Sequence, residues 1–185
     1  MLDGRIDAGE YGSLAVQIQT AAGDVRVWIA RYRGFVYVAA ELPDSTYYWG
    51  DDLVVSLDSD GSGGPGPSVG DQQWYLRRSV DSSMVRRVSR STGRWTEPGK
   101  EAPRLGDRRS GSGWKIASES SGHGWAIELR VREASFKSGA RAPRLALRTF
   151  NDQPQGWWSW PAPCDGLPEQ RVEHVPDLWV PIAWR

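Results

Sequence analysis

Apolar and polar side chains alternate with a period of two along much of this chain, and this periodicity constrains its fold more than any other feature. The pattern is plainest in Trp125–Arg132, where large apolar residues alternate with smaller or charged ones, and Val25–Ala30 shows it as well. Successive strand residues point to opposite faces, so the pattern is typical of a half-buried strand. Only Glu133–Lys137 suits a short turn of helix, because no helical period persists for three turns.

Further short apolar runs, separated by turn-forming residues, extend the β pattern. They predict strands at Phe35–Val38, Leu53–Leu57, Trp74–Leu76, Trp114–Ile116 and Leu145–Leu147. The chain has 21 Gly and 12 Pro, which favours many short strands joined by turns. Long loops are expected at Ser59–Gly70, Ser91–Ser112 and Asp152–Glu169. We therefore expect residues 1–185 to form one all-β domain, a two-sheet antiparallel β-sandwich of jelly-roll type with at most one short helix.

The charge of the chain argues against nucleic acid as a partner. The net charge is zero, and the 20 Arg against 3 Lys indicate a GC-rich genome more than selection for phosphate. Acidic residues gather in Glu41–Asp60 and basic ones in Arg77–Arg109, a distribution that two solvated or mutually neutralising faces explain. No apolar run is long enough for a transmembrane helix. No secretory signal is visible, so the compartment stays open; a periplasmic or secreted location is favoured if a signal has been removed.

Catalytic chemistry finds little support in the sequence. There is no Gly-x-Ser-x-Gly or His-Glu-x-x-His motif, and the only histidines are His123 and His174. Glu128 could act as an acid or base, but a glycosidase needs two carboxylates at a defined separation. Heme ligation by Met84, Lys115 or either histidine lacks an attachment motif. The single Cys164 excludes an internal disulfide. We therefore expect a protein that is not an enzyme.

Aromatic residues are the strongest functional signal, since the chain holds 11 Trp and 6 Tyr. Trp157, Trp158 and Trp160 stand together just after the polar group Asn151–Gln155. Indole rings can stack on the C–H faces of sugars while neighbouring amides and carboxylates bind the hydroxyls. On a strand, Trp158 and Trp160 would face one way and Trp157 the other. The alternative is that these indoles cover one end of the core.

Several segments in order resemble the family 9 carbohydrate-binding module-like domains, which are related to the DOMON group. The resemblance rests on Leu2-Asp3-Gly4, Val25–Ala30, Gly50–Asp58, Gly70–Tyr75, Gly124–Leu129 and Phe150-Asn151-Asp152, and it spans residues 2–161. It implies a β-sandwich and a slot in which two aromatic rings hold a terminal sugar. Two departures stand out: Glu10-Tyr11-Gly12 replaces a Trp-rich acidic stretch, and the basic loop Ser91–Ser112 is foreign to the family pattern.

The resemblance also implies where the sugar would bind. One wall of the slot would come from Tyr48 or Trp49, and the opposite wall from Trp157 or Trp158. The predicted polar contacts come from Asp52, Arg77 and Asn151. The alternative for Tyr48 and Trp49 is that they pack against neighbouring strands.

Calcium is a possible cofactor, because the resemblance implies it in some members. Asp58 and Asp60, in Asp58-Ser59-Asp60-Gly61, could supply oxygen ligands at short spacing, with Asp71 as a further candidate. An EF-hand is excluded because its last position is Val69. The alternative is a solvated Asp-Gly turn.

Two functions follow from these observations. The first is a non-catalytic module that binds carbohydrate through an aromatic slot. The alternative is a protein-interaction or structural module, an accessory subunit of a larger bacterial complex that docks through its Trp- and Arg-rich surface. Trp and Arg are both enriched in protein interfaces, which supports the alternative.

Overall fold

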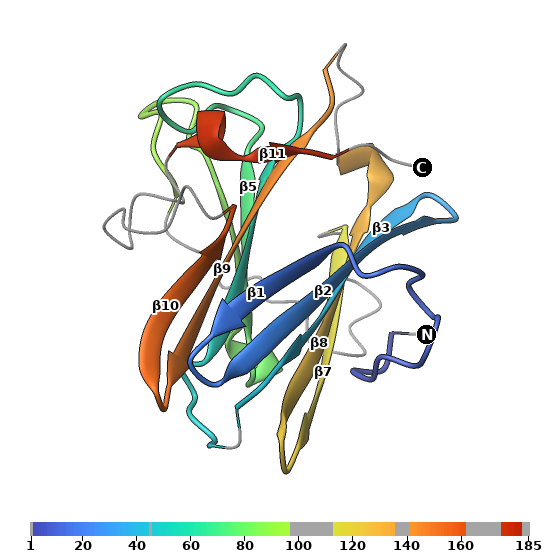
Figure 1. The fold of residues 1–185 in the computed structure, drawn as a ribbon. Helices are drawn as coiled ribbons and strands as arrows, with labels where there is room; N and C mark the ends of the chain where they lie inside the picture. The colour runs from blue at the N-terminus through green and yellow to red at the C-terminus, as the bar shows by residue number, and fades with distance from the viewer. Residues whose placement is uncertain (1, 45, 97–112, 136–140, 162–174, 183–185) are drawn as a thin grey trace.

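Two antiparallel sheets packed face to face form the molecule (Figure 1). The structure is a computed structural model, and it describes residues 2–44, 46–96, 113–135, 141–161 and 175–182. Sheet A has the strand order β1-β2-β3-β8-β7, and sheet B has the order β10-β9-β4-β5-β6 with β11 paired to β9. No helix in these ranges is long and apolar enough to cross a membrane.

The strands follow the alternation of the sequence closely. Sheet A contains β1 (Val16–Thr20), β2 (Gly23–Tyr32), β3 (Phe35–Leu42), β7 (Trp114–Ser121) and β8 (Gly124–Arg132). Sheet B contains β4 (Asp52–Asp58), β5 (Gln72–Arg77), β6 (Met84–Arg87), β9 (Arg144–Asp152), β10 (Gln155–Trp160) and β11 (Val180–Pro181). Three short 3₁₀ turns accompany them in the described ranges: η1 (Val80–Ser82), η2 (Glu133–Ser135) and η5 (Pro176–Leu178).

The core lies between the sheets and draws on every second residue of each strand. On β4, Leu53, Val55 and Leu57 face the core and are almost fully buried. The register sets Val55 between Trp74 of β5 and Leu147 of β9, so these neighbours point inward as well. Residues of opposite parity therefore form the outer face of sheet B.

Each outer face is partly covered by a chain end. The N-terminal segment lies along sheet A (Figure 1), where Asp3 N and Gly4 N donate to Glu128 Oε2 at 2.7 and 2.5 Å. Gly4 packs so closely on β7 that a Cβ there would lie 2.6 Å from Ser118 C. On sheet B, the segment 175–182 places the buried Trp179 over Ala146.

The structure confirms the two-sheet β-sandwich and adds strands that the sequence did not indicate. β1 and β6 were not predicted, and β10 occupies part of the predicted loop Asp152–Glu169. The predicted helical turn is the 3₁₀ turn η2 at Glu133–Ser135. Residues 97–112 of the predicted basic loop, 162–169 of the predicted third loop, Cys164, His174 and Lys137 lie outside the described residues.

Candidate ligand-binding face

A row of predicted site residues crosses the outer face of sheet B. Trp157 on β10 is paired with Phe150 on β9, Phe150 with Asp52 on β4, and Asp52 with Arg77 on β5. All four have the parity that points away from the core. Residues as far apart in the sequence as Asp52 and Trp157 therefore share one surface, which we call the aromatic face.

Four aromatic rings form a continuous chain on this face. Their centroids are 4.5 Å apart for Trp157 and Phe150, 6.4 Å for Phe150 and Tyr48, and 5.5 Å for Tyr48 and Trp49. These spacings fall in the range of favourable aromatic pairs. Trp49 is 62% exposed, and the other three rings are half-buried. Tyr48 folds back over Gly50, where a Cβ would meet its ring at 2.4 Å, so the turn requires glycine.

Arginine side chains stack on the aromatic rings of the face. The guanidinium carbon of Arg148 lies 4.2 Å from the centroid of Trp157, and that of Arg77 lies 5.6 Å from Trp49. On the neighbouring strands, Arg86 lies 4.7 Å from the ring of Tyr75. Such cation–π contacts hold both partners in fixed positions.

Asp51 ties together the two loops that carry the rings. Its carboxylate accepts hydrogen bonds from Tyr48 N (3.1 Å) and from Asp152 N in the β9–β10 hairpin (3.3 Å). Arg78 Nη1 lies 3.6 Å from the same carboxylate. Burial, followed by the nearby Asp44, raises the pKa of Asp51 to about 6. Asp51 is fully buried and therefore positions the site without touching a ligand.

Two predicted site residues do not share this surface. Trp158 has inward parity and packs against the core, and its ring lies where a Cβ at Gly156 would sit. Asn151 is also of inward parity, only 7% exposed, and its Nδ2 donates to Gln153 O at 3.2 Å within the hairpin. Both sit one residue from an outward side chain, and strand alternation turns them to the other side.

The predicted calcium residues lie at the opposite end of β4. Asp58 is fully buried and accepts hydrogen bonds from Ser62 N (3.2 Å) and Gly63 N (2.8 Å), and Asp60 accepts a second one from Ser62 N (3.1 Å). Burial, and then repulsion by Asp58 and Asp60, raise the pKa of Asp71 to about 6. Within the part of the chain that the structure describes, no three His, Cys, Asp or Glu side chains are placed to bind a metal ion. Calcium binding stays a prediction of the sequence.

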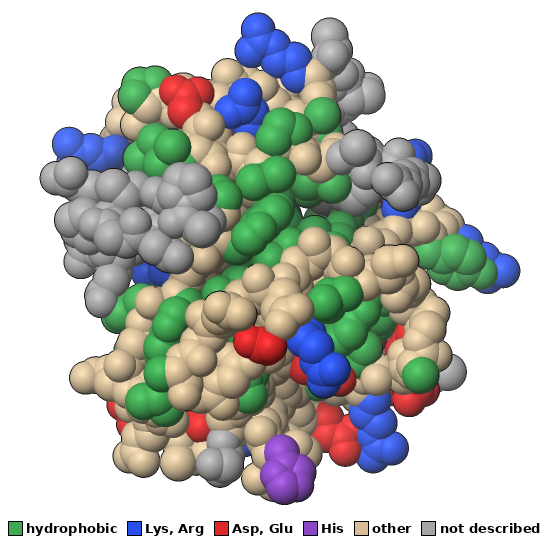
Figure 2. Space-filling model, viewed as in Figure 1, with side chains coloured by type: hydrophobic (Ala, Val, Ile, Leu, Met, Phe, Trp, Pro, Cys, Tyr) green, Lys and Arg blue, Asp and Glu red, His purple; other side chains and the backbone are tan. Residues whose placement is uncertain are grey.

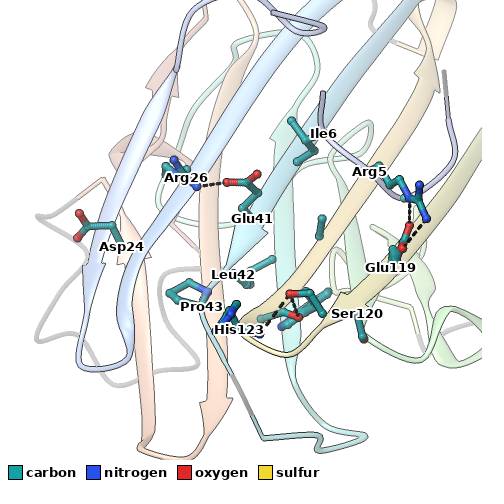
Figure 3. A pocket seen from close by; sticks show the side chains of 15 residues that line it. Arg5, Ile6, Asp24, Arg26, Glu41, Leu42, Pro43, Glu119, Ser120 and His123 are labelled. Carbon is teal, nitrogen blue, oxygen red and sulfur yellow. Dashed lines mark hydrogen bonds and ion pairs between the residues drawn. The ribbon is translucent and has the colours of Figure 1, made fainter. Parts of the chain in front are cut away.

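A cavity of about 440 Å³ opens on the outer face of sheet A (Figure 3). Ion pairs flank it on both sides: Arg5 pairs with Glu119, and Arg26 with Glu41 (Figure 3). Figure 2 likewise shows acidic and basic side chains side by side low on this face. Because these charges are used within the protein and Trp125 in the lining is buried, the cavity offers a ligand fewer groups than the aromatic face does.

Glu128 on the same sheet has a structural role. It is fully buried, and it accepts a hydrogen bond from Tyr11 Oη in addition to the two from Asp3 N and Gly4 N. Burial raises its pKa, against the opposing effect of these three hydrogen bonds. Acid–base chemistry, which the sequence left open for Glu128, does not fit a carboxylate enclosed in this way.

Two solved structures resemble the whole chain. Both are of a carbohydrate binding module family 9 from Caldicellulosiruptor kristjanssonii, one in complex with glucose (TM-score 0.59) and one in complex with cellotriose (TM-score 0.62). Each match is 11% identical and covers 100% of this chain, with 92% and 90% of the other chains. This chain has the family 9 module fold. No family model matches the sequence, and no curated protein sequence matches it significantly.

The fold likeness confirms the resemblance in the sequence at the level of the β-sandwich; a relation to the DOMON group stays a prediction. Sequence reasoning missed Phe150, Arg148 and Asp51 as parts of the face. Phe150 and Arg148 could have been found from the alternation of Arg144–Asp152, once that segment is recognised as a strand beside β4. The contacts of Asp51 join separate loops, and no local pattern signals them.

Proposed function

We propose that this protein is a non-catalytic module that binds carbohydrate on the aromatic face. The observation that carries the proposal is the ring chain from Trp157 to Trp49, exposed at one end and set in one row with Asp52 and Arg77. A sugar presents apolar C–H faces that stack on such rings, while its hydroxyl groups need polar partners beside them.

The two walls of the predicted slot would be Trp49 and Trp157, at opposite ends of the ring chain. Phe150 and Tyr48 lie between them and form its floor. Arg77 offers in-plane N–H donors to hydroxyl groups, which gives direction to an otherwise apolar contact. Asp52 shares the row, but at 3% exposure it presents little of its carboxylate to a ligand. Trp158 would support the floor from the core side.

The fold likeness supports this proposal, because the two similar structures are binding modules in complex with glucose and with cellotriose. The absence of recognised catalytic motifs agrees with it. Glu128, the carboxylate best placed on a strand for acid–base work, is held by the N-terminal segment.

Calorimetric titration with glucose and cellotriose, preceded by a glycan array to find the best ligand, tests the proposal. Trp157→Ala and Trp49→Ala should each weaken binding of that ligand at least tenfold, because each removes a stacking surface. Trp28→Ala is the matched control, since Trp28 is also half-buried and stacked by an arginine, Arg26 at 5.9 Å, but lies on sheet A. Equal losses in all three variants, or no glycan bound by the folded wild type, would overturn the proposal.

The alternative, a protein-interaction module, would use the same surface. Exposed Trp49 and Tyr47, each stacked by an arginine, have the composition of a protein interface. The glycan array separates the two functions. A folded protein that binds no glycan but elutes from its native source in a complex that Trp49→Ala disrupts would establish the alternative.

A further inference from the structure

Three arginines on sheet B place positive charge on the aromatic face. Arg148 on β9, Arg77 on β5 and Arg86 on β6 all have outward parity, because their cross-strand partners Val54, Asp52 and Gln73 alternate with the core residues of β4 and β5. A neutral sugar needs donors and acceptors in similar measure. This face supplies guanidinium groups in excess.

The stacking of these arginines leaves the N–H groups in the guanidinium plane able to bind a ligand. A guanidinium stacked on a ring uses its flat surface, while its five N–H donors lie in the plane. Arg77 stacks on the exposed Trp49, and Arg86 stacks on Tyr75 and donates from Nη1 to its hydroxyl at 3.2 Å. Within the described ranges, Arg77 Nε and Arg86 Nε are buried and have no hydrogen-bond partner, so an anion would be bound through the Nη groups.

Five arginines elsewhere in the described residues pair with carboxylates. Ion pairs in the described ranges join Arg5, Arg26, Arg31, Arg78 and Arg144 to Glu119, Glu41, Glu133, Asp51 and Asp177 respectively. Neither Arg77 nor Arg86 forms one with any described residue. Among the described residues, therefore, no carboxylate neutralises the guanidinium of Arg77 on the aromatic face.

Most acidic groups at this edge are engaged in other contacts. Asp44 Oδ1 accepts from Thr46 N and Oγ1 at 2.8 and 2.7 Å, and Asp51 is bound by two backbone N–H groups. Asp52 is only 3% exposed. Asp152, half-buried in the hairpin, is the described acid left to oppose an anion on this face.

We propose that the aromatic face selects an acidic sugar, one whose carboxylate or sulfate ester is bound by Arg77 while its ring stacks on Trp49 or Trp157. This inference rests on the proposed carbohydrate-binding function and names its ligand class. Guanidinium groups match both anions in geometry, since each anion offers two oxygens to parallel N–H donors.

Oligosaccharides that share a β-1,4-linked backbone and differ in charge test the preference for acidic sugars. Titration with cellotriose, with the β-1,4-linked trimer of glucuronic acid and with sulfated cellotriose compares neutral, carboxylate and sulfate forms directly. The better acidic ligand should bind at least tenfold more tightly than cellotriose. Its advantage should shrink when sodium chloride is raised from about 50 to about 500 mM, because salt screens exposed charges.

Variants test whether the aromatic face is responsible for the preference for acidic sugars. Arg77→Gln should lower the acid-to-neutral affinity ratio about tenfold, and Asp152→Asn should raise that ratio two- to threefold by removing a like charge. Arg26→Gln, which removes a ring-stacked arginine from sheet A, should leave the ratio unchanged. A ratio near one in the wild type, or an unchanged ratio in Arg77→Gln, overturns the acidic-sugar inference and leaves the proposed function standing. Binding to neither acidic nor neutral oligosaccharides removes both.

Discussion

The outer faces of the two sheets are built from similar residues and differ in how some of their arginines are held. On sheet A, arginines pair with glutamates, and the buried Glu128 fastens the N-terminal segment over the strands. On sheet B, arginines stack on aromatic rings that stay partly exposed. Both faces could be described as charged and aromatic from composition alone. What separates them is that Arg5 and Arg26 over sheet A each have a carboxylate partner, whereas Arg77 on sheet B has none among the described residues.

The largest effect, on stability, should come from removing the carboxylate of Glu128 that binds the N-terminal segment to sheet A. Glu128→Ala leaves Asp3 N, Gly4 N and Tyr11 Oη without their common acceptor, and we expect a loss of about 3 kcal/mol in the free energy of unfolding. Urea denaturation measures it. Ligand affinity at the aromatic face should stay unchanged; a parallel loss of affinity would mean that the two faces are coupled.

A smaller effect, on pH dependence, should come from the buried carboxylates of sheet B. The pKa of Asp71 is raised to about 6 in the folded protein, so the native state binds a proton that the unfolded chain has already released. Stability should therefore fall as pH rises from about 4 to 6, by about 2 kcal/mol for Asp71.

Asp71→Asn should flatten only part of this slope, because Asp51 and Glu128 also have raised pKa values and titrate in the same direction. Urea midpoints measured at several pH values would show it. A slope that the variant leaves unaltered would assign the dependence to other groups.

Loss of Asp51 should weaken the binding site more than the fold. Asp51→Ala releases Tyr48 N and Asp152 N, so the two loops lose their common anchor, and we expect ligand affinity to fall about tenfold, or about 1.4 kcal/mol. Asp51→Asn retains one acceptor oxygen, so its ligand affinity should fall less. Calorimetry on both variants, with thermal unfolding as the control, distinguishes positioning from misfolding; equal affinity in Asp51→Ala and wild type would contradict the role.

The smallest effect should come from the exposed ion pairs that flank the sheet A cavity. Arg5→Gln breaks its pair with Glu119, in which both side chains are largely exposed, so stability should change by less than about 1 kcal/mol. Ligand binding should not change. Loss of glycan binding in this variant would move the site from sheet B to the cavity.

The sequence predicted the architecture better than the site, for reasons visible in single residues. Alternation in Trp125–Arg132 reflects a strand with one buried face, and the structure places Ile127 and Leu129 in the core as expected. β10 was taken for a loop because prolines and turn residues surround Trp157–Trp160. Once that segment is a strand, Trp157 and Trp158 must separate, as the alternation rule requires.

Asn151 shows where local reasoning fails. Its place beside the tryptophans suggested a polar partner for a ligand, but one step along the strand turned it inward. Arg77 and Asp52 were predicted through family resemblance, and they are direct cross-strand neighbours. The role of Asp51 depends on contacts between segments that lie far apart in the chain, which no single window of sequence contains.

The uneven burial of the tryptophans gives the protein an internal optical probe. Trp74, Trp114, Trp125 and Trp179 are each at most 3% exposed, whereas Trp49 is 62% exposed. A water-soluble collisional quencher such as iodide reaches Trp49 first among the described indoles. A ligand stacked on that ring would shield it, so occupancy of the aromatic face can be followed by fluorescence without any added label.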